Sequence, residues 1–260
     1  MTTWTVDRAA TALLAAEDSG ADLEPLTSEW PGLDLAAAYE VQDETLRRRL
    51  ARGERLIGIK LGLTSRAKQQ RMNVTSPLTA WLTDAMVLPA GAAVPQDRLI
   101  HPRAEPEIVF VLRDRLSGPG VTAATALTAV GSVYGGIEII DSRFRDFRFT
   151  LPDVVADNAS SGFFVTGPVG VSPAGLDLAL EACLLETGGQ IVDSATGAAV
   201  QGHPAEALAL AANDLGRRGL AIEPGWIVLT GGMTDAVNVP RGATLAAHFT
   251  HVGSVFLSGG

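Results

Sequence analysis

The sequence predicts an α+β protein in which a helical N-terminal layer precedes a β-rich core. Two amphipathic helical patterns open the chain, and from residue 56 onward short segments rich in Val and Ile recur between Gly, Pro and Asp. The 260 residues are 47% hydrophobic, which is ample for one sizeable core. No linker and no repeat of fixed period stands out. We therefore expect a single domain over 1–260, with the helical layer at 1–55 and the β-rich core at 56–260.

The N-terminal helices are expected at 6–18 and 34–52. Asp34 suits the N-cap of the second helix, because its side chain can accept from the N–H groups of the first turn, and Gly53 suits the stop. Four later stretches also show helical patterns, near 65–72, 122–132, 175–181 and 204–218. The last of them carries Pro204 in its first turn, where a missing N–H costs nothing.

Seven short apolar or alternating segments predict strands, at 56–63, 107–113, 136–141, 162–166, 226–230, 244–249 and 253–257. The second belongs to the stretch HPRAEPEIVFVL, in which Glu105 and Glu107 stand at the head of an apolar run. Residues i and i+2 of a strand share a face, so both carboxylates point the same way. The other face carries Ile108 and Phe110, and a strand that is apolar on both faces is normally buried.

The chain is acidic, with 29 Asp and Glu against 20 Lys and Arg and a formal net charge of −9. A nucleic-acid partner is disfavoured, because phosphate binding needs a basic face, and the run at 47–49 is expected to be a solvated helix face. The single cysteine, Cys183, excludes an intrachain disulfide and a Cys-based zinc site, and we expect a buried, inert thiol. No signal-peptide pattern and no apolar run of about 18 residues stands out, so we expect a cytoplasmic protein without a membrane partner.

Three glutamates form the first candidate site. Glu105 and Glu107 suit a hard cation such as magnesium or manganese, and the alternative is an exposed edge of an amphipathic strand. Glu138 lies between isoleucines in GGIEIIDSR, where either a metal ion or a buried ion pair with an arginine would offset the cost of an unpaired charge. The three together predict a facial ligand set with open coordination positions. Asp141 lies on the opposite face and is expected to pair with Arg143.

Lys60 in IGIKLGLTS is the second candidate, because apolar residues flank it. One interpretation is a surface lysine whose ammonium reaches solvent, and the other is a desolvated amine with a lowered pKa. The residue and its neighbours alone favour the surface lysine, and Gly58 and Gly62 on either side, which permit close backbone approach, add some support to the functional interpretation.

Two polar clusters follow. VVADNASSGFFV contains Asp157, Ser160 and Ser161, which form either an Asx-type turn or a set of donors for a carboxylate or enolate. In LTGGMTDAVNV, Thr230 and Thr234 together with backbone N–H groups suit a carboxylate, and a simple hairpin turn is an equal alternative. No Walker motif is present, and no nucleotide fingerprint of the GxGxxG kind follows a strand.

Six segments in chain order resemble the 2-keto-4-pentenoate hydratase and 4-oxalocrotonate decarboxylase family, within the fumarylacetoacetate hydrolase superfamily. They are IGIKLGLTS, LIHPRAEPEI, IEIIDSRF, VVADNASS, GHP and IVLTGGMT, which together span nearly the whole chain. The forms IDSRF, LTGGMT and IKLGLTS favour the decarboxylase branch. The resemblance implies a mixed β-sandwich roll, like the C-terminal part of fumarylacetoacetate hydrolase, with peripheral helices.

The resemblance also implies roles for individual residues. A magnesium or manganese ion would be held by Glu105, Glu107 and Glu138. The expected catalytic residues are Lys60, Asp84 and Ser161. The expected substrate contacts come from Leu61, Arg143, Asp157, Ser160, Thr230 and Thr234.

The segment SPLTAWLTD departs from the family pattern. Thr79 and Ala80, followed by Trp81, stand where the family usually has an aromatic residue and then Gly. A left-handed turn that suits Gly resists Ala, so we expect a reshaped loop here. Substrate identity is the property that such a change affects.

The reaction implied by the resemblance is metal-dependent decarboxylation of 2-oxohex-3-enedioate to 2-hydroxypenta-2,4-dienoate and CO2, by a carbon–carbon lyase of aromatic meta-cleavage catabolism. The alternatives are a hydratase acting on 2-hydroxypenta-2,4-dienoate, a C–C hydrolase of acylpyruvates and a non-enzymatic binding module. The hydrolase usually needs a His–Glu pair, but His101 is more simply structural, and His203 is more simply a helix cap or a core contact. The family further implies a homo-oligomer and a complex with a hydratase partner.

Overall fold

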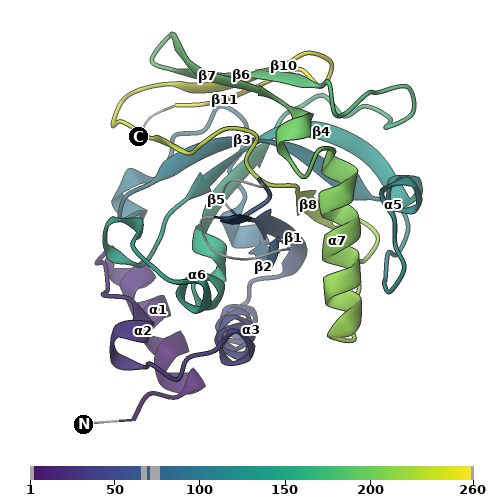
Figure 1. Cartoon of the computed structure of the whole chain (residues 1–260). Coiled ribbons are helices and arrows are strands. Elements are labelled where there is room, and N and C mark those ends of the chain that lie inside the picture. The colour runs from purple at the N-terminus through teal and green to yellow at the C-terminus, as the bar shows by residue number, and fades with distance from the viewer. Residues whose placement is uncertain (1–2, 66–68, 71–76, 259–260) are drawn as a thin grey trace.

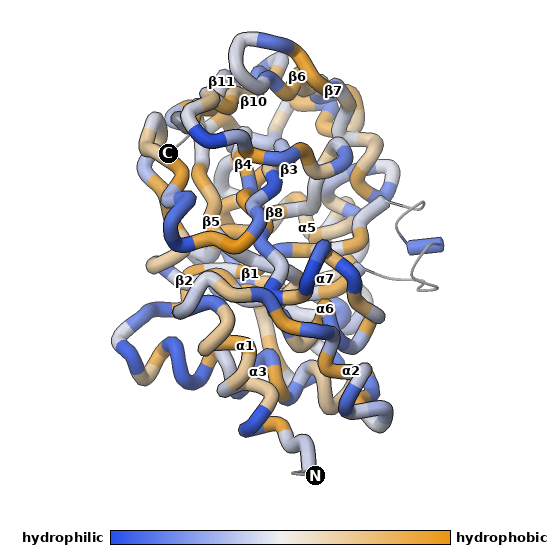
Figure 2. Tube along the Cα trace, turned by 90° about the vertical axis from the view of Figure 1, so that its left-hand side faces the viewer, coloured by the Kyte–Doolittle hydropathy of each residue, from blue (hydrophilic) through white to orange (hydrophobic). Residues whose placement is uncertain are grey.

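The computed structural model describes residues 3–65, 69–70 and 77–258. Its elements form three layers (Figure 1), which are an N-terminal group of helices, a large mixed sheet and a small antiparallel sheet. Figure 2 shows the same order from the side, running from the helices near the N-terminus to the small sheet at the opposite end. The predicted α+β class, with a mixed sheet system and peripheral helices, is confirmed.

The large sheet carries the candidate site. In the described part of the chain its strands run in the order β2-β1-β8-β3-β4-β5, and β9 pairs with β3. They are β1 (Leu56–Gly62), β2 (Leu78–Thr83), β3 (Arg103–Leu112), β4 (Val130–Ile140), β5 (Ser161–Thr166), β8 (Ile227–Leu229) and β9 (Val237–Asn238). β1 and β8 are parallel, and the other neighbouring strands are antiparallel.

The small sheet packs against one face of the large sheet. Its strands are β6 (Ala182–Thr187), β7 (Gln190–Thr196), β10 (Leu245–Phe249) and β11 (Ser254–Leu257), all paired antiparallel. The main core includes Ile108 and Ile137 of the large sheet and Phe249 of the small one. The sheets are so close at Gly135 that an added Cβ would lie 2.5 Å from the Phe249 ring, so only Gly fits there.

Helices surround the sheets. They are α1 (Val6–Ser19), α2 (Leu26–Glu29), α3 (Leu35–Ala51), α5 (Ala123–Ala129), α6 (Leu151–Ala156) and α7 (Pro204–Arg217). The predicted N-caps are confirmed, since Asp34 accepts from the N–H of Ala37 at 2.8 Å and His203 from that of Ala205 at 3.0 Å. Among the described helices, none has the length and apolar character that crossing a membrane requires.

The N-terminal helices share a second hydrophobic core with the elements that border the site. Leu13 of α1 packs in one cluster with Val155 of α6 and with Phe144, which follows β4. Gln42 of α3 is buried and donates to two backbone carbonyls, that of Thr79 in β2 at 3.1 Å and that of Val155 at 3.0 Å. The helical layer therefore supports both β2 and α6.

Several elements differ from the sequence-based expectation. Residues 175–181 form turns in place of a helix, because the carboxylate of Asp177 accepts from N–H groups two and three residues on. The helix expected at 122–132 ends at Ala129, because β4 begins at the next residue, Val130. β2, β6, β7, α2 and α6 lie in segments for which no element was expected. The helix expected at 65–72 falls mostly outside the described residues.

Candidate metal and substrate site

Three buried glutamates from two neighbouring strands converge on one face of the large sheet. In the antiparallel register of β3 and β4, Glu105 lies directly opposite Glu138, and Glu107 lies opposite Gly136. Since residues two apart share a face, all three carboxylates lie on the face turned away from the main core. One oxygen of each carboxylate lies within 4.8 Å of the others, and the residues are 8%, 2% and 0% exposed for Glu105, Glu138 and Glu107. The structure thus brings the predicted ligand set together.

The backbone of two glycines after β8, Gly231 and Gly232, lies in close contact with these glutamates. The N–H of Gly231 donates to Glu107 Oε2 at 2.7 Å. Its φ of +107°, and the 2.0 Å between an added Cβ and Thr64 Oγ1, restrict this position to Gly. At Gly232 an added Cβ would lie 2.6 Å from the carboxyl carbon of Glu105. The glycine pair therefore belongs to the wall of the glutamate cluster.

Lys60 supplies a cation to the cluster. Its Nζ lies 3.0 Å from Glu138 Oε1 and 3.3 Å from Oε2, and the residue is 3% exposed. The ammonium does not reach solvent, so the surface-lysine interpretation is wrong. Gly58 lets β1 approach β8 closely, because an added Cβ would lie 2.0 Å from the Ile227 carbonyl oxygen. This approach fixes the strand that carries Lys60.

The electrostatics of the cluster suit a divalent cation. Burial raises the pKa of Glu107 well above its ordinary value, and the charges of Glu138 and Glu105 raise it further. Burial also raises the pKa of Glu138, although the Lys60 ammonium acts in the opposite direction. Glu107 Oε1 is buried and has no hydrogen-bond partner among the described residues. A hard cation fits this donor set, because it would bind that oxygen and offset the repulsion between the carboxylates.

A pocket of about 730 Å³ opens beside the cluster. Its polar side includes Lys60, Glu105 and Ser160. Its apolar lining includes Leu63, Leu78, Ile140, Phe147, Phe149 and Val154. A concave site with mostly apolar walls and a few polar groups at one side suits a small organic acid with an unsaturated carbon chain.

The turn before β5 brings Ser160 to the pocket. Asn158, Ala159 and Ser160 have φ values of 49°, 50° and 57°, which residues other than Gly rarely adopt. The Asn158 side chain bonds the backbone of Trp81 in both directions, accepting at 2.8 Å and donating at 2.9 Å. These bonds offset the backbone strain. Since such strain persists mainly at functional sites, the turn is a candidate functional element.

Arg143 and Asp157 hold the same turn from the protein interior. The Arg143 guanidinium bonds the Asp157 carboxylate and donates to the carbonyls of Asp157 and Ser161, at 2.6 and 2.8 Å. Burial raises the pKa of Asp157 to about 6, against the attraction of the arginine. The predicted pairing of Arg143 with Asp141 is wrong, because Asp141 accepts from two backbone N–H groups just before β3. Arg143 and Asp157 are expected substrate contacts that lie behind the pocket wall.

Ser160, and not Ser161, faces the pocket. The Ser161 hydroxyl donates to the carbonyl of Asn158 at 2.7 Å, and Ser161 is the first residue of β5. The Ser160 hydroxyl lies 3.4 Å from the Asp157 carboxylate, and Ser160 lines the pocket beside Lys60. The serine that lines the pocket is therefore Ser160, one residue before the expected Ser161.

Three further expected substrate contacts do not line the pocket. Leu61 follows Lys60 on β1 and so points into the main core. Thr230 is buried and donates to the Ile108 carbonyl of β3 at 2.8 Å. Thr234 donates to the carbonyl of the next residue at 2.9 Å. The Leu61 side chain therefore packs in the core, and the hydroxyls of Thr230 and Thr234 bond to backbone carbonyls.

Asp84 lies beyond the end of β2, away from the glutamates. Its carboxylate accepts from the N–H and from the Nε of Arg55, both at 2.8 Å. In the β1–β2 register Lys60 pairs with Ala80, so Asp84 stands four residues farther along. Asp84 therefore lies outside the glutamate cluster and is not among the residues that line the 730 Å³ pocket. The expected reshaped loop is wrong too, because Thr79 and Ala80 lie in a regular, buried strand.

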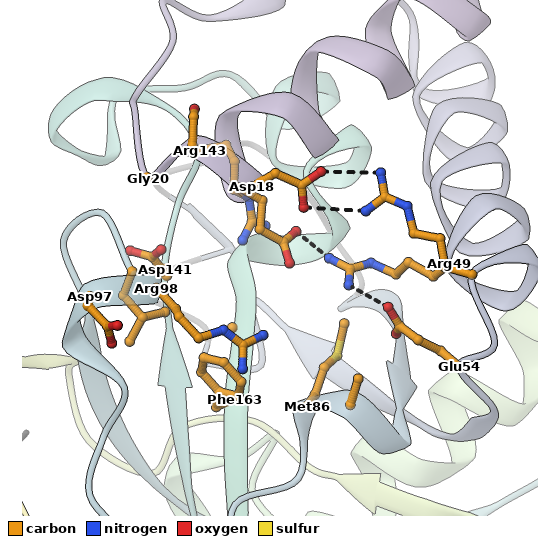
Figure 3. Close-up of a pocket in the computed structure, with 16 residues that line it drawn as sticks. Asp18, Gly20, Arg49, Glu54, Met86, Asp97, Arg98, Asp141, Arg143 and Phe163 are labelled. Atoms are coloured by element: carbon orange, nitrogen blue, oxygen red, sulfur yellow. Dashed lines mark hydrogen bonds and ion pairs between the residues drawn. The ribbon is translucent and has the colours of Figure 1, made fainter.

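A second pocket, of about 380 Å³, is lined by Arg143 and three other arginines. Figure 3 shows Arg49 directed at Glu54 and at a carboxylate of α1. Arg52 also pairs with Asp18, at 3.2 Å. These ion pairs join α1 to α3 and to the start of β1, so we assign this pocket a structural role.

Arg103 and Phe147 are among the residues of the first pocket that the expected site omitted. The Arg103 guanidinium lies 4.1 Å from the centroid of the Phe147 ring, and both residues line the pocket. Arg103 could have been predicted from strand alternation, because residues 103, 105 and 107 lie on the same face of a strand. Phe147 has a φ of +56° in the irregular segment after β4, where no periodicity marks it.

No family model matches the chain. The sequence is similar to 4-oxalocrotonate decarboxylase of Pseudomonas sp. (strain CF600), with 42% identity over 234 residues that cover 90% of this chain and 89% of that protein. It is also similar to 2-hydroxyhexa-2,4-dienoate hydratase of Comamonas testosteroni, with 44% identity over 232 residues and 88% of each chain covered.

Two solved structures place the fold in context. The 4-oxalocrotonate decarboxylase from Pseudomonas putida G7, complexed with magnesium and adipate, matches with a TM-score of 0.93 and 37% identity over 99% of both chains. Fumarylpyruvate hydrolase from Pseudomonas aeruginosa, in complex with Mn2+ and pyruvate, matches with a TM-score of 0.62 and 16% identity over 78% of this chain and 88% of that one. The second match concerns the fold alone.

Proposed function

Because this chain belongs to the family of 4-oxalocrotonate decarboxylases and 2-keto-4-pentenoate hydratases, within the fumarylacetoacetate hydrolase superfamily, we propose that it decarboxylates 2-oxohex-3-enedioate. The products are 2-hydroxypenta-2,4-dienoate and CO2, which makes the protein a carbon–carbon lyase of meta-cleavage catabolism. The proposed cofactor is magnesium or manganese, bound by Glu105, Glu107 and Glu138.

The buried glutamate cluster beside an apolar pocket carries this proposal. The cluster offers oxygen ligands for a hard cation, and the pocket walls suit an unsaturated chain. The solved relative that contains magnesium also holds adipate, a six-carbon dicarboxylate of the same chain length as the proposed substrate.

In the proposed reaction the bond between C5 and C6 breaks, and C6 leaves as CO2. The electron pair of that bond forms the C4–C5 double bond, the C3–C4 pair moves to C2–C3, and negative charge reaches the 2-oxo oxygen. A divalent cation supplies Lewis-acid stabilisation of this charge. The glutamates fix the cation on the sheet face, and the apolar walls keep water away from the developing dienolate.

Lys60 and Ser160 are the groups that we propose contact the substrate. Lys60 lines the pocket, where its ammonium can protonate the dienolate or orient a carboxylate. Ser160, which lies just before β5 and lines the same pocket, donates a hydrogen bond to the bound acid. Arg143 and Asp157 act through the turn, by keeping Ser160 in position.

Release of CO2 from 2-oxohex-3-enedioate, measured with magnesium and with a chelator, tests this function. We expect release that requires the metal and that matches the amount of dienol formed. The absence of metal-dependent release would refute decarboxylation. Turnover of 2-hydroxypenta-2,4-dienoate alone would identify a hydratase.

Hydration of 2-hydroxypenta-2,4-dienoate is the second candidate, because relatives of comparable identity are hydratases. The hydratase reaction starts from the same dienol, so it needs the same cation and the same pocket. C–C hydrolysis has less support. His101 packs against the Phe147 ring with 4.8 Å between centroids and His203 caps α7, so neither forms a His–Glu pair in the described structure.

We also propose a homo-oligomer that forms through the outer face of the small sheet. Leu184, Ile191 and Phe256 lie on this face and are 45%, 52% and 51% exposed. A patch of large apolar side chains of this kind commonly marks a protein interface. Light scattering at two protein concentrations measures the assembly. A complex with a hydratase partner and a cytoplasmic location remain predictions from the family.

A further inference from the structure

Arg103 is a half-buried cation of the pocket whose side chain has no polar partner among the described residues. Its guanidinium packs over the Phe147 ring, and no ion pair or side-chain hydrogen bond joins it to the rest of the described chain. The segments outside the description contain no Asp or Glu, namely 1–2, 66–68, 71–76 and 259–260. Because this guanidinium lines the pocket and has no carboxylate partner among the described residues, it can donate to a carboxylate brought by a ligand.

The other described cations of the pocket already have partners. Lys60 is paired with Glu138, and Arg148 is exposed and lies 3.7 Å from Asp146. Among the described cations that line the pocket, Arg103 is therefore the one without a carboxylate partner in the described part of the chain.

The position of Arg103 relative to the glutamates fits a dicarboxylate of six carbons. It stands two residues before Glu105 on β3 and on the same face, so the two Cα atoms are about 7 Å apart. Standard bond lengths separate the two carboxyl carbons of an extended six-carbon diacid by about 6 Å. A ligand with one carboxylate at the glutamate-bound cation therefore brings the other to the guanidinium.

We propose that Arg103 binds the carboxylate of the substrate that leaves as CO2, and so selects dicarboxylates over monocarboxylates. This inference rests on the proposed function. The planar guanidinium can donate two parallel hydrogen bonds to a carboxylate. The Phe147 ring contacts both the Arg103 guanidinium, at 4.1 Å from the ring centroid, and the His101 ring, at 4.8 Å between centroids, and these contacts restrict the position of the guanidinium.

This contact serves substrate binding more than bond cleavage. The leaving carboxylate loses its charge as CO2 forms, so its attraction to Arg103 is stronger in the ground state than in the transition state. Arg103 is therefore a specificity residue. Its loss should raise KM for the dicarboxylate at least about tenfold and change kcat by less than about threefold.

Calorimetric titration with adipate and with hexanoate, in the presence of magnesium, tests the inference without turnover. Hexanoate replaces one carboxylate of adipate by a methyl group. We expect the wild type to bind adipate at least about tenfold more tightly, and Arg103→Gln to lower this preference to less than about threefold. Arg103→Lys should retain part of the preference for adipate, because lysine keeps the positive charge but cannot donate two parallel hydrogen bonds from one planar group.

Arg113→Gln is the matched control. It removes an exposed arginine just past the other end of β3, which bonds Asp114 and the Thr128 carbonyl. It should keep the full preference for adipate, and Arg103→Gln should bind magnesium like the wild type.

Three results would overturn the role of Arg103. They are a wild type without preference for adipate, an unchanged preference in Arg103→Gln, and an equal loss of adipate and hexanoate binding in that variant. Kinetics on 2-oxohex-3-enedioate separates this role from the proposed function. An inactive wild type with Arg103-dependent adipate binding would refute the function and keep the dicarboxylate site. An active wild type whose Arg103→Gln variant keeps its KM would refute the role of Arg103 alone.

Discussion

Glu107 is the most deeply buried member of the glutamate cluster. It is 0% exposed, accepts one hydrogen bond from Gly231, and leaves its second oxygen without a partner among the described residues. A buried carboxylate in such surroundings destabilises the metal-free protein. The unpartnered oxygen, Glu107 Oε1, belongs to the glutamate cluster. A cation bound there would pair with this oxygen and so remove the destabilisation.

We predict that Glu107→Gln weakens magnesium binding at least about a hundredfold, because it removes a charged ligand. The fold should persist, since the glutamine amide oxygen can still accept from Gly231. Isothermal calorimetry measures the binding. Glu223→Gln is the control, because Glu223 is exposed and pairs only with Arg115 among the described residues. A Glu107→Gln variant that binds magnesium like the wild type would remove Glu107 from the ligand set.

The raised pKa of Glu107 also gives the sign of a pH dependence. A carboxyl group with a raised pKa contributes stability that is fully present below its unfolded-state pKa, here 4.5, and that is lost as the pH rises through the raised value. In metal-free buffer Glu107→Gln should therefore gain stability relative to the wild type as the pH rises above the unfolded-state pKa and through the raised value. Thermal unfolding across this range measures the difference. A constant difference would contradict the raised pKa.

Single residues of the site differ in how far the sequence predicts them. The glutamates follow from strand alternation, because a two-residue period places Glu105 and Glu107 on one face whatever surrounds them. Ser160 does not follow, since the choice between two adjacent serines depends on where β5 begins and on three successive left-handed residues. Asp84 was expected at the site, but the length of β2 places it too far along the strand.

The turn between α6 and β5 depends on one buried ion pair. The Arg143–Asp157 pair is 4% and 1% exposed, and its bonds reach the backbone at both ends of the turn. The pair thus connects the interior of the protein to the serine that faces the pocket.

We predict that Asp157→Asn lowers the free energy of unfolding by about 3–5 kcal/mol, because it leaves the Arg143 charge buried without its partner. kcat/KM should fall as well, since Ser160 loses its support. Urea unfolding and steady-state kinetics measure the two effects. Asp84→Asn is the matched control, because it breaks an exposed Asp–Arg pair, and it should leave activity near that of the wild type. A large loss of activity in Asp84→Asn would restore Asp84 to the site.

Whether an element could be predicted depends on how local its signals are. The helix over α3 carries its own N-cap and stop, Asp34 and Gly53, and the structure confirms it within one residue at each end. The stretch 175–181 has helical composition, but the Asp177 side chain bonds the backbone and turns the chain. β2 lacks a period because it is buried along its whole length, and burial on both faces removes the alternation.

The helical layer and the sheets form one structural unit through the second core. Leu13 of α1 is 3% exposed and belongs to the cluster that contains Val155 of α6 and Leu78 of β2. Leu78 also lines the substrate pocket. A substitution that destabilises the packing of the helical layer should therefore also alter the pocket wall at Leu78.

We predict that Leu13→Ala lowers the free energy of unfolding of the whole protein by about 2–5 kcal/mol, because it leaves a cavity in the shared core. Unfolding should remain a single transition, and magnesium binding should be lost at the same urea concentration as helical structure. Circular dichroism and calorimetry at matched urea concentrations measure this. Leu180→Ala is the control, because Leu180 is 68% exposed. An early transition in which magnesium binding survives would show that residues 1–55 form a separate domain.

The proposed metal ligands and part of the pocket wall lie on different kinds of structure. The three glutamates, Lys60 and Arg103 lie on paired strands of the large sheet, whereas Phe147, Ser160 and Asp235 lie on turns and short 3-10 segments that connect the strands and α-helices. Substitutions and insertions accumulate in such segments far more readily than in paired strands. A lineage can therefore acquire a new acid substrate by changing the wall, while the chemistry that stabilises a dienolate is inherited unchanged. This division is consistent with a chain that shares more than a third of its aligned residues with a decarboxylase and also with a hydratase.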